Sequence, residues 1–227
     1  MDLRYSVQRS KKRKKLAITV ERDRRVVVQA PADFSDESIE RAVREKRQWI
    51  YEKTRHSQKY EALPHPPGKE LVTGESALYL GRNYRIELVA ANEKEVRFNR
   101  YFLVPSSTAA ERKGAMRDWY GARASKLLLP RVARHAREIG VNFKQAKIID
   151  SRYRWGSCTV NDNVNLNWRL IKAPMFVIDY VIVHELAHLI EANHTPRFWN
   201  IVRTQVPATE KARSWLREHG QLLEQDS

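Results

Sequence analysis

Three histidines and two glutamates lie within the eleven residues 184–194, HELAHLIEANH. His184 and His188 are four residues apart, so on a helix their side chains project from one face, one turn from each other. Two imidazoles at that spacing can hold one tetrahedral metal ion, and Glu185 can reach a water molecule on the same ion without being a ligand. The pattern predicts a metal site where the ion acidifies a water molecule and Glu185 accepts its proton.

The third ligand is expected among the residues that follow this pair. Asn193 suits the left-handed turn that ends a helix, and Thr195 and Pro196 suit the N-cap and first position of the next one. His194 would then lie in the corner between two helices and fold back towards the pair. Glu191 is the competing third ligand, although it is too close in sequence to span a tetrahedral site comfortably. Three protein ligands leave one position open, as in catalytic zinc sites, and zinc is expected ahead of another divalent metal.

The residues around the motif indicate a buried helix. A mostly apolar run, residues 176–183, leads into His184, and Pro174 suits the first turn of this helix. A buried helix is what a catalytic metal site needs, but it leaves a structural alternative in which the histidines are satisfied core residues. The remaining histidines have polar or linker-like surroundings and are interpreted as surface residues: His56, His65, His135 and His219.

The C-terminal half of the chain predicts helices and short strands around this motif. Thr108 and Glu111 form a capping box that opens a long helix, which Pro130 should kink or restart and Gly140 should end. A strand is expected at residues 146–150. RWGSCTV and VNLNWRL flank the polar NDN and predict a hairpin directly before the motif helix.

The N-terminal half predicts mainly β-structure. LAITV and VVVQA flank a polar turn and predict a hairpin, after which Ser35 should cap one helix. Residues 63–70, LPHPPGKE, are typical of a loop or linker, and two strand pairs follow them. We therefore expect a β-rich N-terminal region with one helix, residues 1–107, followed by an α+β C-terminal domain, residues 108–227.

The composition is that of a soluble globular protein with excess positive charge. Its one cysteine, Cys158, excludes an intramolecular disulfide and a cysteine-rich zinc module. No stretch approaches a membrane span or a signal-peptide core, so we expect a cytoplasmic protein without a membrane partner. The net charge is +15, with +8 in residues 1–60 and +8 in residues 111–155. This charge indicates either solvated surface or a field that attracts a nucleotide or nucleic acid.

Several segments together resemble one known family. SRYRWGSCT, VNLNWRLIKAP, IDYVIVHELAHLIEANHTPRFW and WLREH are similar to the YgjP-like metal-dependent hydrolases, a metallopeptidase-domain family, and the resemblance covers almost the whole chain. It implies a zincin-like α+β domain with an HExxH active-site helix and a small antiparallel sheet. It also implies zinc on His184, His188 and His194, with Glu185 as the base. Members are named metallopeptidases largely from the motif, and some are described as UTP pyrophosphatases.

The segment RWGSC and its neighbours supply the candidate substrate contacts. Arg152 or Arg154 could hold a phosphate or carboxylate through two hydrogen bonds, although structural ion pairs explain these arginines equally well. Ser157 could hydrogen-bond near the cleft, and Gly156 is interpreted as a tight backbone position. Cys158 is interpreted as a small buried side chain, ahead of a thiolate ligand or a redox switch.

Three functions compete at this stage. The first is a zinc peptidase, which follows from the open three-histidine site. The second is a nucleoside triphosphate pyrophosphatase acting on a nucleotide such as UTP, which follows from the basic segment before the motif. The third is a nucleic-acid-associated protein that binds weakly through its basic surface and carries the metal site for another reaction. The expected substrate is therefore a peptide or a nucleotide.

Overall fold

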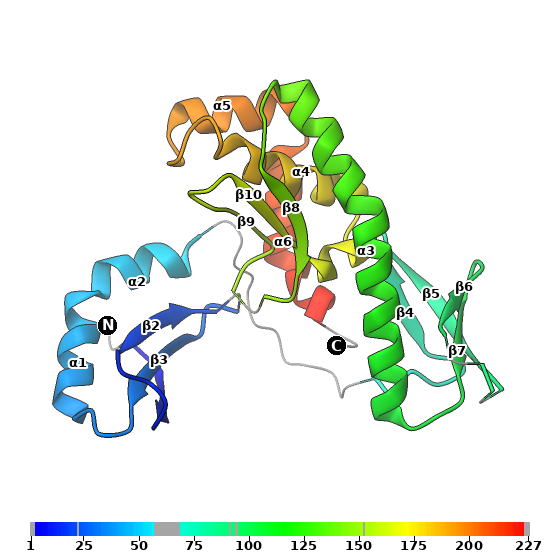
Figure 1. Cartoon of the computed structure of the whole chain (residues 1–227), viewed down its shortest axis with the longest axis horizontal. Helices are drawn as coiled ribbons and strands as arrows, with labels where there is room; N and C mark the ends of the chain where they lie inside the picture. Colours follow the sequence, from blue (N-terminus) through cyan, green and yellow to red (C-terminus); the bar gives the residue numbers. More distant parts are fainter. Residues whose placement is uncertain are drawn as a thin grey trace.

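The structure is a computed structural model of the chain, and it shows an α+β protein built from helices and small sheets (Figure 1). It describes residues 3–21, 23–56, 69–90, 92–93, 95–151 and 153–224. The linker-like segment expected at residues 63–70 therefore lies outside the described residues, except for its last two. Within the described parts, no helix is long and apolar enough to cross a membrane.

The first part of the chain forms a small sheet and two helices, which we call the N-terminal unit (residues 3–56). Its elements are β1 (Ser6–Ser10), β2 (Ala17–Val20), β3 (Val26–Pro31), α1 (Asp36–Glu45) and α2 (Arg47–Thr54). The strand order is β1-β3-β2, and the antiparallel pairing of β2 with β3 confirms the expected hairpin. Val28, Ile39 and Ile50 are at most 1% exposed and join the sheet to both helices through one apolar cluster.

The N-terminal unit contains two helices where the sequence predicted one. Ser35 caps α1 as expected, because its hydroxyl oxygen accepts a hydrogen bond from the Ser38 amide at 3.3 Å. The helix ends at Glu45, and the backbone of Lys46 (φ −93°, ψ 8°) separates it from α2. In α2, Ile50 is buried in the apolar cluster, whereas Trp49 is 37% exposed.

A second sheet packs against the long helix α3 (Ala109–Ile139) (Figure 1). Its strands are β4 (Ser76–Tyr79), β5 (Arg82–Val89), β6 (Arg97–Phe98) and β7 (Phe102–Pro105), in the order β4-β5-β7-β6. The turn between β4 and β5 reaches the segment before the motif helix, where the Gly81 amide donates to the Lys172 carbonyl at 2.8 Å. A Cβ atom on Gly81 would lie 2.6 Å from Cγ of Pro174, so glycine permits this close approach.

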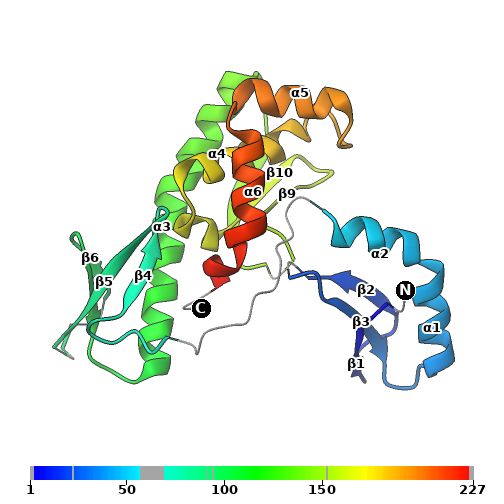
Figure 2. The same cartoon turned by 180° about the vertical axis from the view of Figure 1, so that it is seen from behind.

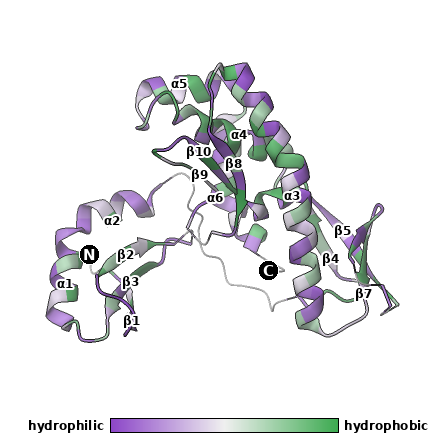
Figure 3. Ribbon diagram, in the orientation of Figure 1, coloured by the Kyte–Doolittle hydropathy of each residue, from purple (hydrophilic) through white to green (hydrophobic). Residues whose placement is uncertain are grey.

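Helix α3 spans residues 109–139 without interruption, and its caps are those predicted. Thr108 and Glu111 form the capping box, and Gly140 ends the helix with a left-handed backbone (φ 78°). Of the two expected effects of Pro130, a kink or a restart, the restart does not occur, because the helix continues through this residue. Buried residues recur every four positions along one face: Met116, Tyr120, Ala124, Leu128 and Val132. Hydrophobic and hydrophilic residues accordingly alternate along α3 in Figure 3.

The remaining elements surround the histidine motif. They are β8 (Gln145–Ile149), β9 (Gly156–Cys158), β10 (Asn163–Asn167), η1 (Trp168–Lys172), α4 (Met175–Ala187), α5 (Pro196–Gln205), α6 (Thr209–His219) and η2 (Gly220–Glu224). Helices α5 and α6 both contact α4, and Figure 2 shows α6 in front, beside α4.

The sheet beside α4 is mixed, which corrects the expected antiparallel sheet. Its order is β8-β10-β9, with β9 antiparallel and β8 parallel to the central strand β10. Local sequence predicts the β9–β10 hairpin, but it does not specify which edge an earlier strand joins or in which direction.

Buried apolar side chains form two clusters among the described residues. The first lies within the N-terminal unit. The second extends from Leu71 to Leu223 and includes residues of β4, β5, β7, α3 and α4. The strands of the second sheet therefore share a core with the motif helix. The division into residues 1–107 and 108–227 stays a prediction.

Candidate metal centre

Helix α4 brings the first two histidines of the motif into the protein interior. Every residue from Tyr180 to Ala187 is buried, and the exposed fractions of His184 and Glu185 are 1% and 2%. The helix ends at Ala187, but His188 keeps a right-handed helical backbone (φ −65°, ψ −17°) as its C-cap. The two histidines therefore keep the one-turn relationship that their spacing predicts.

The structure brings His194 back to this pair. One nitrogen atom from each of the three histidines forms a group within 4.8 Å, and among the described residues that group contains no other side chain. Nε2 of His194 lies 3.1 Å from Nε2 of His184. The ring centres are 5.1 Å apart for His184 and His188, and 4.9 Å apart for His194 and either of the other two. Three convergent imidazoles are a donor set that fits zinc or a similar divalent ion.

The turn that returns His194 differs from the expected one. Asn193 is not among the residues with a positive φ angle, so the left-handed helix end predicted there was wrong. The chain leaves the helix earlier, through hydrogen bonds from the Leu189 amide to Leu186 and from the Glu191 amide to Ala187. The start of α5 is as predicted, because the Thr195 hydroxyl oxygen accepts from the Phe198 amide at 3.3 Å.

Two neighbouring groups orient the imidazoles. Nδ1 of His188 lies 3.3 Å from the carbonyl oxygen of Glu191, and Nδ1 of His184 lies 3.5 Å from the hydroxyl of Tyr180. Because these contacts use Nδ1, the Nε2 atoms can face the shared centre. Glu191 was the alternative third ligand, but its carboxylate lies outside the three-histidine group. It contributes its backbone carbonyl to the orientation of His188.

The surroundings keep the three histidines in their neutral form. Burial lowers the pKa of His184 well below its usual range, and the neighbouring His188 and His194 lower it further. Burial also lowers the pKa of His194 to about 4, helped by His188, Lys53 and Arg213. Burial lowers the pKa of His188 as well, against the opposing effect of the Glu191 carbonyl. Neutral imidazole is the form that binds a metal ion.

The side chain of Glu185 lies against Gly156 of strand β9, where any larger residue would clash with it. A Cβ atom on Gly156 would lie 2.6 Å from Cγ and 2.8 Å from Oε1 of Glu185. Gly156 has no positive φ angle, so the glycine of RWGSC is required for space and not for a tight backbone conformation. The sequence pattern draws attention to Gly156. It does not show that the Glu185 side chain occupies the space that a side chain at position 156 would need.

Cys158 lies on the same face of β9, two residues after Gly156. Burial raises the pKa of its thiol to about 11, with further contributions from the charges of Glu185 and Asp162. The half-buried thiol is therefore protonated, and its sulfur contacts the Thr159 carbonyl at 3.7 Å. It also lies outside the three-histidine group, so the structure gives no support to a thiolate ligand.

The expected substrate contacts on this hairpin have different surroundings. The Ser157 hydroxyl is partly buried and accepts a hydrogen bond from Nδ2 of Asn165 at 3.2 Å, on the neighbouring strand. Arg154 is exposed, and its carbonyl accepts from Nδ2 of Asn167 at 3.3 Å. Arg152 lies outside the described residues. The role of all three in substrate binding stays a prediction.

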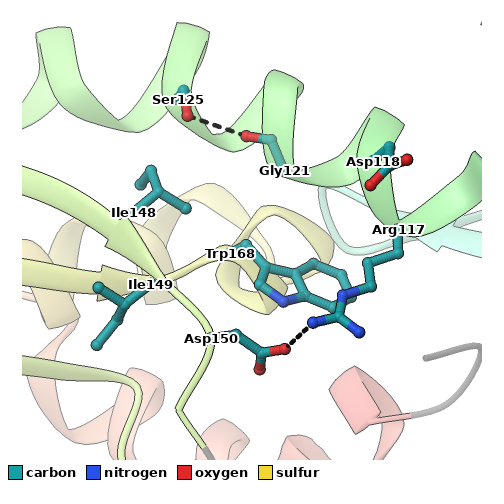
Figure 4. A pocket seen from close by; sticks show the side chains of 8 residues that line it. All are labelled: Arg117, Asp118, Gly121, Ser125, Ile148, Ile149, Asp150 and Trp168. Atoms are coloured by element: carbon teal, nitrogen blue, oxygen red, sulfur yellow. Dashed lines mark hydrogen bonds and ion pairs between the residues drawn. The ribbon is translucent and has the colours of Figure 1, made fainter. Parts of the chain in front are cut away.

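A hollow between α3 and the end of β8 contains the charged side chains of Arg117 and Asp150 (Figure 4). Asp150, directly after β8, forms ion pairs of 2.5 Å with Arg117 of α3 and with Arg169 of η1. Partial burial alone would raise the pKa of Asp150, but its bonds to Arg169 and the nearby Arg117 lower it. These two ion pairs connect the end of β8 to α3 and to η1.

Aromatic and basic residues line the outer side of the three histidines. The ring of Trp199 stacks on His194 at 5.6 Å and 25°, and Phe198 packs within 4.9 Å of all three histidine rings. The Arg213 guanidinium lies 4.6 Å from the centre of the Trp199 ring, and it pairs with Glu210 at 2.9 Å. A packed aromatic wall of this kind fixes the imidazoles and limits the access of water.

Three of the four histidines that were interpreted as surface residues are buried or partly buried in the structure. His135 is only 6% exposed, and its Nε2 lies 3.0 Å from Oδ1 of Asp179. His56 is half-buried, and its ring centre lies 5.2 Å from that of His194. The polar residues next to them in the sequence did not indicate this burial, because each histidine contacts a residue far away in the chain. His219 is partly buried against Trp215, and His65 lies outside the described residues.

Three convergent imidazoles beside a buried carboxylate are the type of site that metal-dependent hydrolases use. The chain belongs to the YgjP-like family, whose description is "YgjP-like, metallopeptidase domain" and which matches residues 14–219. The chain is similar to the crystal structure of the metallopeptidase zymogen of Pyrococcus abyssi abylysin. The match covers 40% of this chain and 98% of the zymogen chain, with 16% sequence identity and a TM-score of 0.35. A search of curated proteins finds no match. Family membership supports a metal-dependent hydrolase.

Proposed function

We propose that this protein is a zinc-dependent hydrolase of the metallopeptidase type that cleaves a peptide bond. The observation that carries the proposal is the group formed by His184, His188 and His194, whose ligand atoms lie within 4.8 Å of one another. The buried carboxylate of Glu185 directly follows the first of them on the same helix. Three histidines with an open fourth position are typical of catalytic zinc.

Each part of the site has a chemical role in this proposal. His184, His188 and His194 would hold the zinc ion, which would lower the pKa of a water molecule and polarise the scissile carbonyl. Glu185 accepts the proton from the attacking water and passes it to the leaving amine. Gly156 leaves the space in which the Glu185 carboxylate lies. Tyr180 and the Glu191 carbonyl keep the imidazoles correctly oriented.

Arg152, Arg154 and Ser157 are the proposed substrate contacts. Arg154 is exposed on the chain that enters β9, so its guanidinium can pair with a carboxylate or phosphate of a bound substrate. The Ser157 hydroxyl retains a proton to donate, since it accepts the bond from Asn165. If these residues bind substrate, Arg154→Ala should raise KM and leave zinc binding unchanged.

The decisive experiment compares two matched variants on a peptide library. Zinc-loaded wild-type protein should release peptide fragments, whereas Glu185→Gln should bind zinc equally and release them at least about a hundredfold more slowly. Glu191→Gln makes the same chemical change six residues away, outside the three-histidine group, and should keep the wild-type activity. A library left intact by wild-type protein with a full zinc content would overturn the peptidase proposal.

A nucleoside triphosphate pyrophosphatase is the second candidate, and the charge around the site favours it. After burial and His188, the positive charges of Lys53 and Arg213 also lower the pKa of His194. The same charges would attract an anionic substrate to the centre. Such chemistry usually uses Mg²⁺ bound to the phosphates, which the nucleotide itself would bring. Release of UMP and pyrophosphate from UTP, lost in His188→Ala, would support this activity; an unreactive set of nucleotides would exclude it.

A further inference from the structure

A fourth histidine, His56, lies beside the candidate metal centre and comes from the N-terminal unit. Its ring centre is 5.2 Å from that of His194, and the two rings are tilted by 59°. The three histidines of the motif lie 4.9 to 5.1 Å apart by the same measure. The ring of His56 thus extends the histidine cluster at nearly the spacing that its members have among themselves.

This spacing is the one that shared metal ligation requires. With Zn–N bonds of about 2.0–2.1 Å, imidazoles at two corners of a tetrahedron have ring centres about 5 Å apart. Aromatic rings that merely pack together also occur in this range, between about 4.5 and 7 Å. A second observation is therefore needed to show that the end of α2 is directed at the centre.

The end of α2 holds the His56 ring beside the cluster. The His56 amide donates to the Lys53 carbonyl at 3.3 Å, so the helical turn persists beyond Thr54. The ring planes of His56 and His194 are tilted by 59°, which lies within the 41–84° found among the three motif histidines. His56 therefore matches the motif histidines in both the spacing and the tilt of its ring.

We propose that His56 is a fourth protein ligand of the metal in the substrate-free protein. This inference rests on the proposed function, since it needs a metal ion on His184, His188 and His194. The ring nitrogens of His56 are not part of the group within 4.8 Å, so ligation requires the end of α2 to move inwards. A metal held by four imidazoles has no position for substrate, so a substrate has to displace His56. The N-terminal unit then controls access to the centre.

X-ray absorption at the zinc edge of the full-length protein tests this directly. Wild-type protein should show four imidazole ligands, and His56→Ala should show three together with one oxygen ligand. Zinc affinity, measured by competition with a chelating dye, should fall by about tenfold or more in His56→Ala. Arg55→Ala is the matched control, because it changes the same end of α2 without removing an imidazole, and it should match the wild type.

The possible results separate this inference from the function on which it rests. Three imidazoles in wild-type protein, unchanged by His56→Ala, would overturn the role of His56 and leave the metal-dependent function intact. Wild-type protein that binds no zinc, cobalt or manganese would overturn both. Neither readout needs a known substrate, so both measurements decide the role of His56 even if the protein cleaves no peptide.

Discussion

The two ends of α4 carry polar clusters with different charge balance. Near its start, Asp179 forms hydrogen bonds of 2.8 and 2.7 Å with Arg131 and of 3.0 Å with His135, so its negative charge is matched. Near its end, His184 and His188 meet His194, and their group of ligand atoms contains imidazoles only. The first cluster joins α3 to α4, and in it the charge of the Asp179 carboxylate is balanced by Arg131. The second directs neutral donor atoms at one shared point.

The pKa values of the two clusters express this difference. Burial alone would raise the pKa of Asp179, but the bonds from His135 and Arg131 outweigh it and lower the pKa to about 2. At the other end, burial lowers the pKa of His194 to about 4, and the nearby His188, Lys53 and Arg213 act in the same direction. A charged cluster that is complete without a ligand stabilises the fold, whereas neutral bases arranged around one point are prepared for a metal ion.

Glu185→Gln should have the largest effect and should act on chemistry alone. Removal of a general base reduces kcat by about 10²- to 10⁴-fold, while the three histidines remain. The zinc content, measured by atomic absorption, and the unfolding temperature should stay at wild-type values. Glu191→Gln should leave kcat unchanged. Equal rates for Glu185→Gln and wild type would mean that the motif end of α4, like the Asp179 end, has only a structural role.

Gly156→Ala should disturb both the fold and the reaction. The new Cβ atom would lie 2.6 Å from Cγ of Glu185, so the carboxylate or β9 must shift. We expect the free energy of unfolding to fall by about 1–3 kcal/mol, as for other overpacked sites, with kcat reduced and zinc affinity retained. Urea unfolding and steady-state rates measure these changes.

Gly114→Ala is the control for this substitution. Gly114 lies within α3, and apart from its chain neighbours and the nearby backbone of this helix, no atom lies within 4 Å of the position that its Cβ would take. Alanine in an open helical position should be neutral or stabilise by up to about 1 kcal/mol. If both variants behaved alike, glycine at position 156 would not be needed to make room for the Glu185 side chain.

Asp179→Asn should destabilise the protein in a way that depends on pH. The pKa of Asp179 falls from its ordinary 3.8 to about 2 on folding, so its charged form stabilises the fold by about 2 kcal/mol at neutral pH. Because the folded pKa is the lower one, this contribution is complete above about pH 4 and is lost as the pH falls towards 2. Urea unfolding at pH 7 and at pH 2.5 should show a large and then a small difference from wild type.

Asp118→Asn provides the comparison for that measurement. Asp118 is exposed on α3, and its replacement should leave the unfolding free energy unchanged at both pH values. Zinc affinity should survive Asp179→Asn, since the Asp179 cluster is separate from the three imidazoles. A loss of zinc binding together with stability would show that the two ends of α4 are coupled.

Local sequence patterns predicted those parts of this structure that depend on neighbouring residues. The caps at Ser35, Thr108 and Thr195 are hydrogen bonds between residues three apart, and all three form as expected. The spacing of His184 and His188 predicted their shared face for the same reason. These features need only the geometry of one helical turn.

Contacts between distant segments could not be predicted in this way. His56 and His194 meet only because the N-terminal unit lies beside the motif, and no spacing along the chain encodes that. The same holds for the parallel pairing of β8 with β10 and for the fit of Glu185 against Gly156. Each depends on how separate elements pack, and periodicity reports only which face of an element is buried.

Thr195→Ala should have the smallest effect, and it tests how tightly local order is linked to the metal centre. The Thr195 hydroxyl oxygen caps α5 through the Phe198 amide, directly after His194. Loss of such a cap costs about 1 kcal/mol of unfolding free energy. If the cap also fixes His194, zinc affinity should fall by up to about fivefold, the equivalent of that energy. Thr108→Ala removes a comparable cap from α3 and should lower stability to a similar degree without changing zinc affinity. Equal zinc affinities in the two variants would mean that packing against Trp199 and Phe198, and not the start of α5, holds His194 in place.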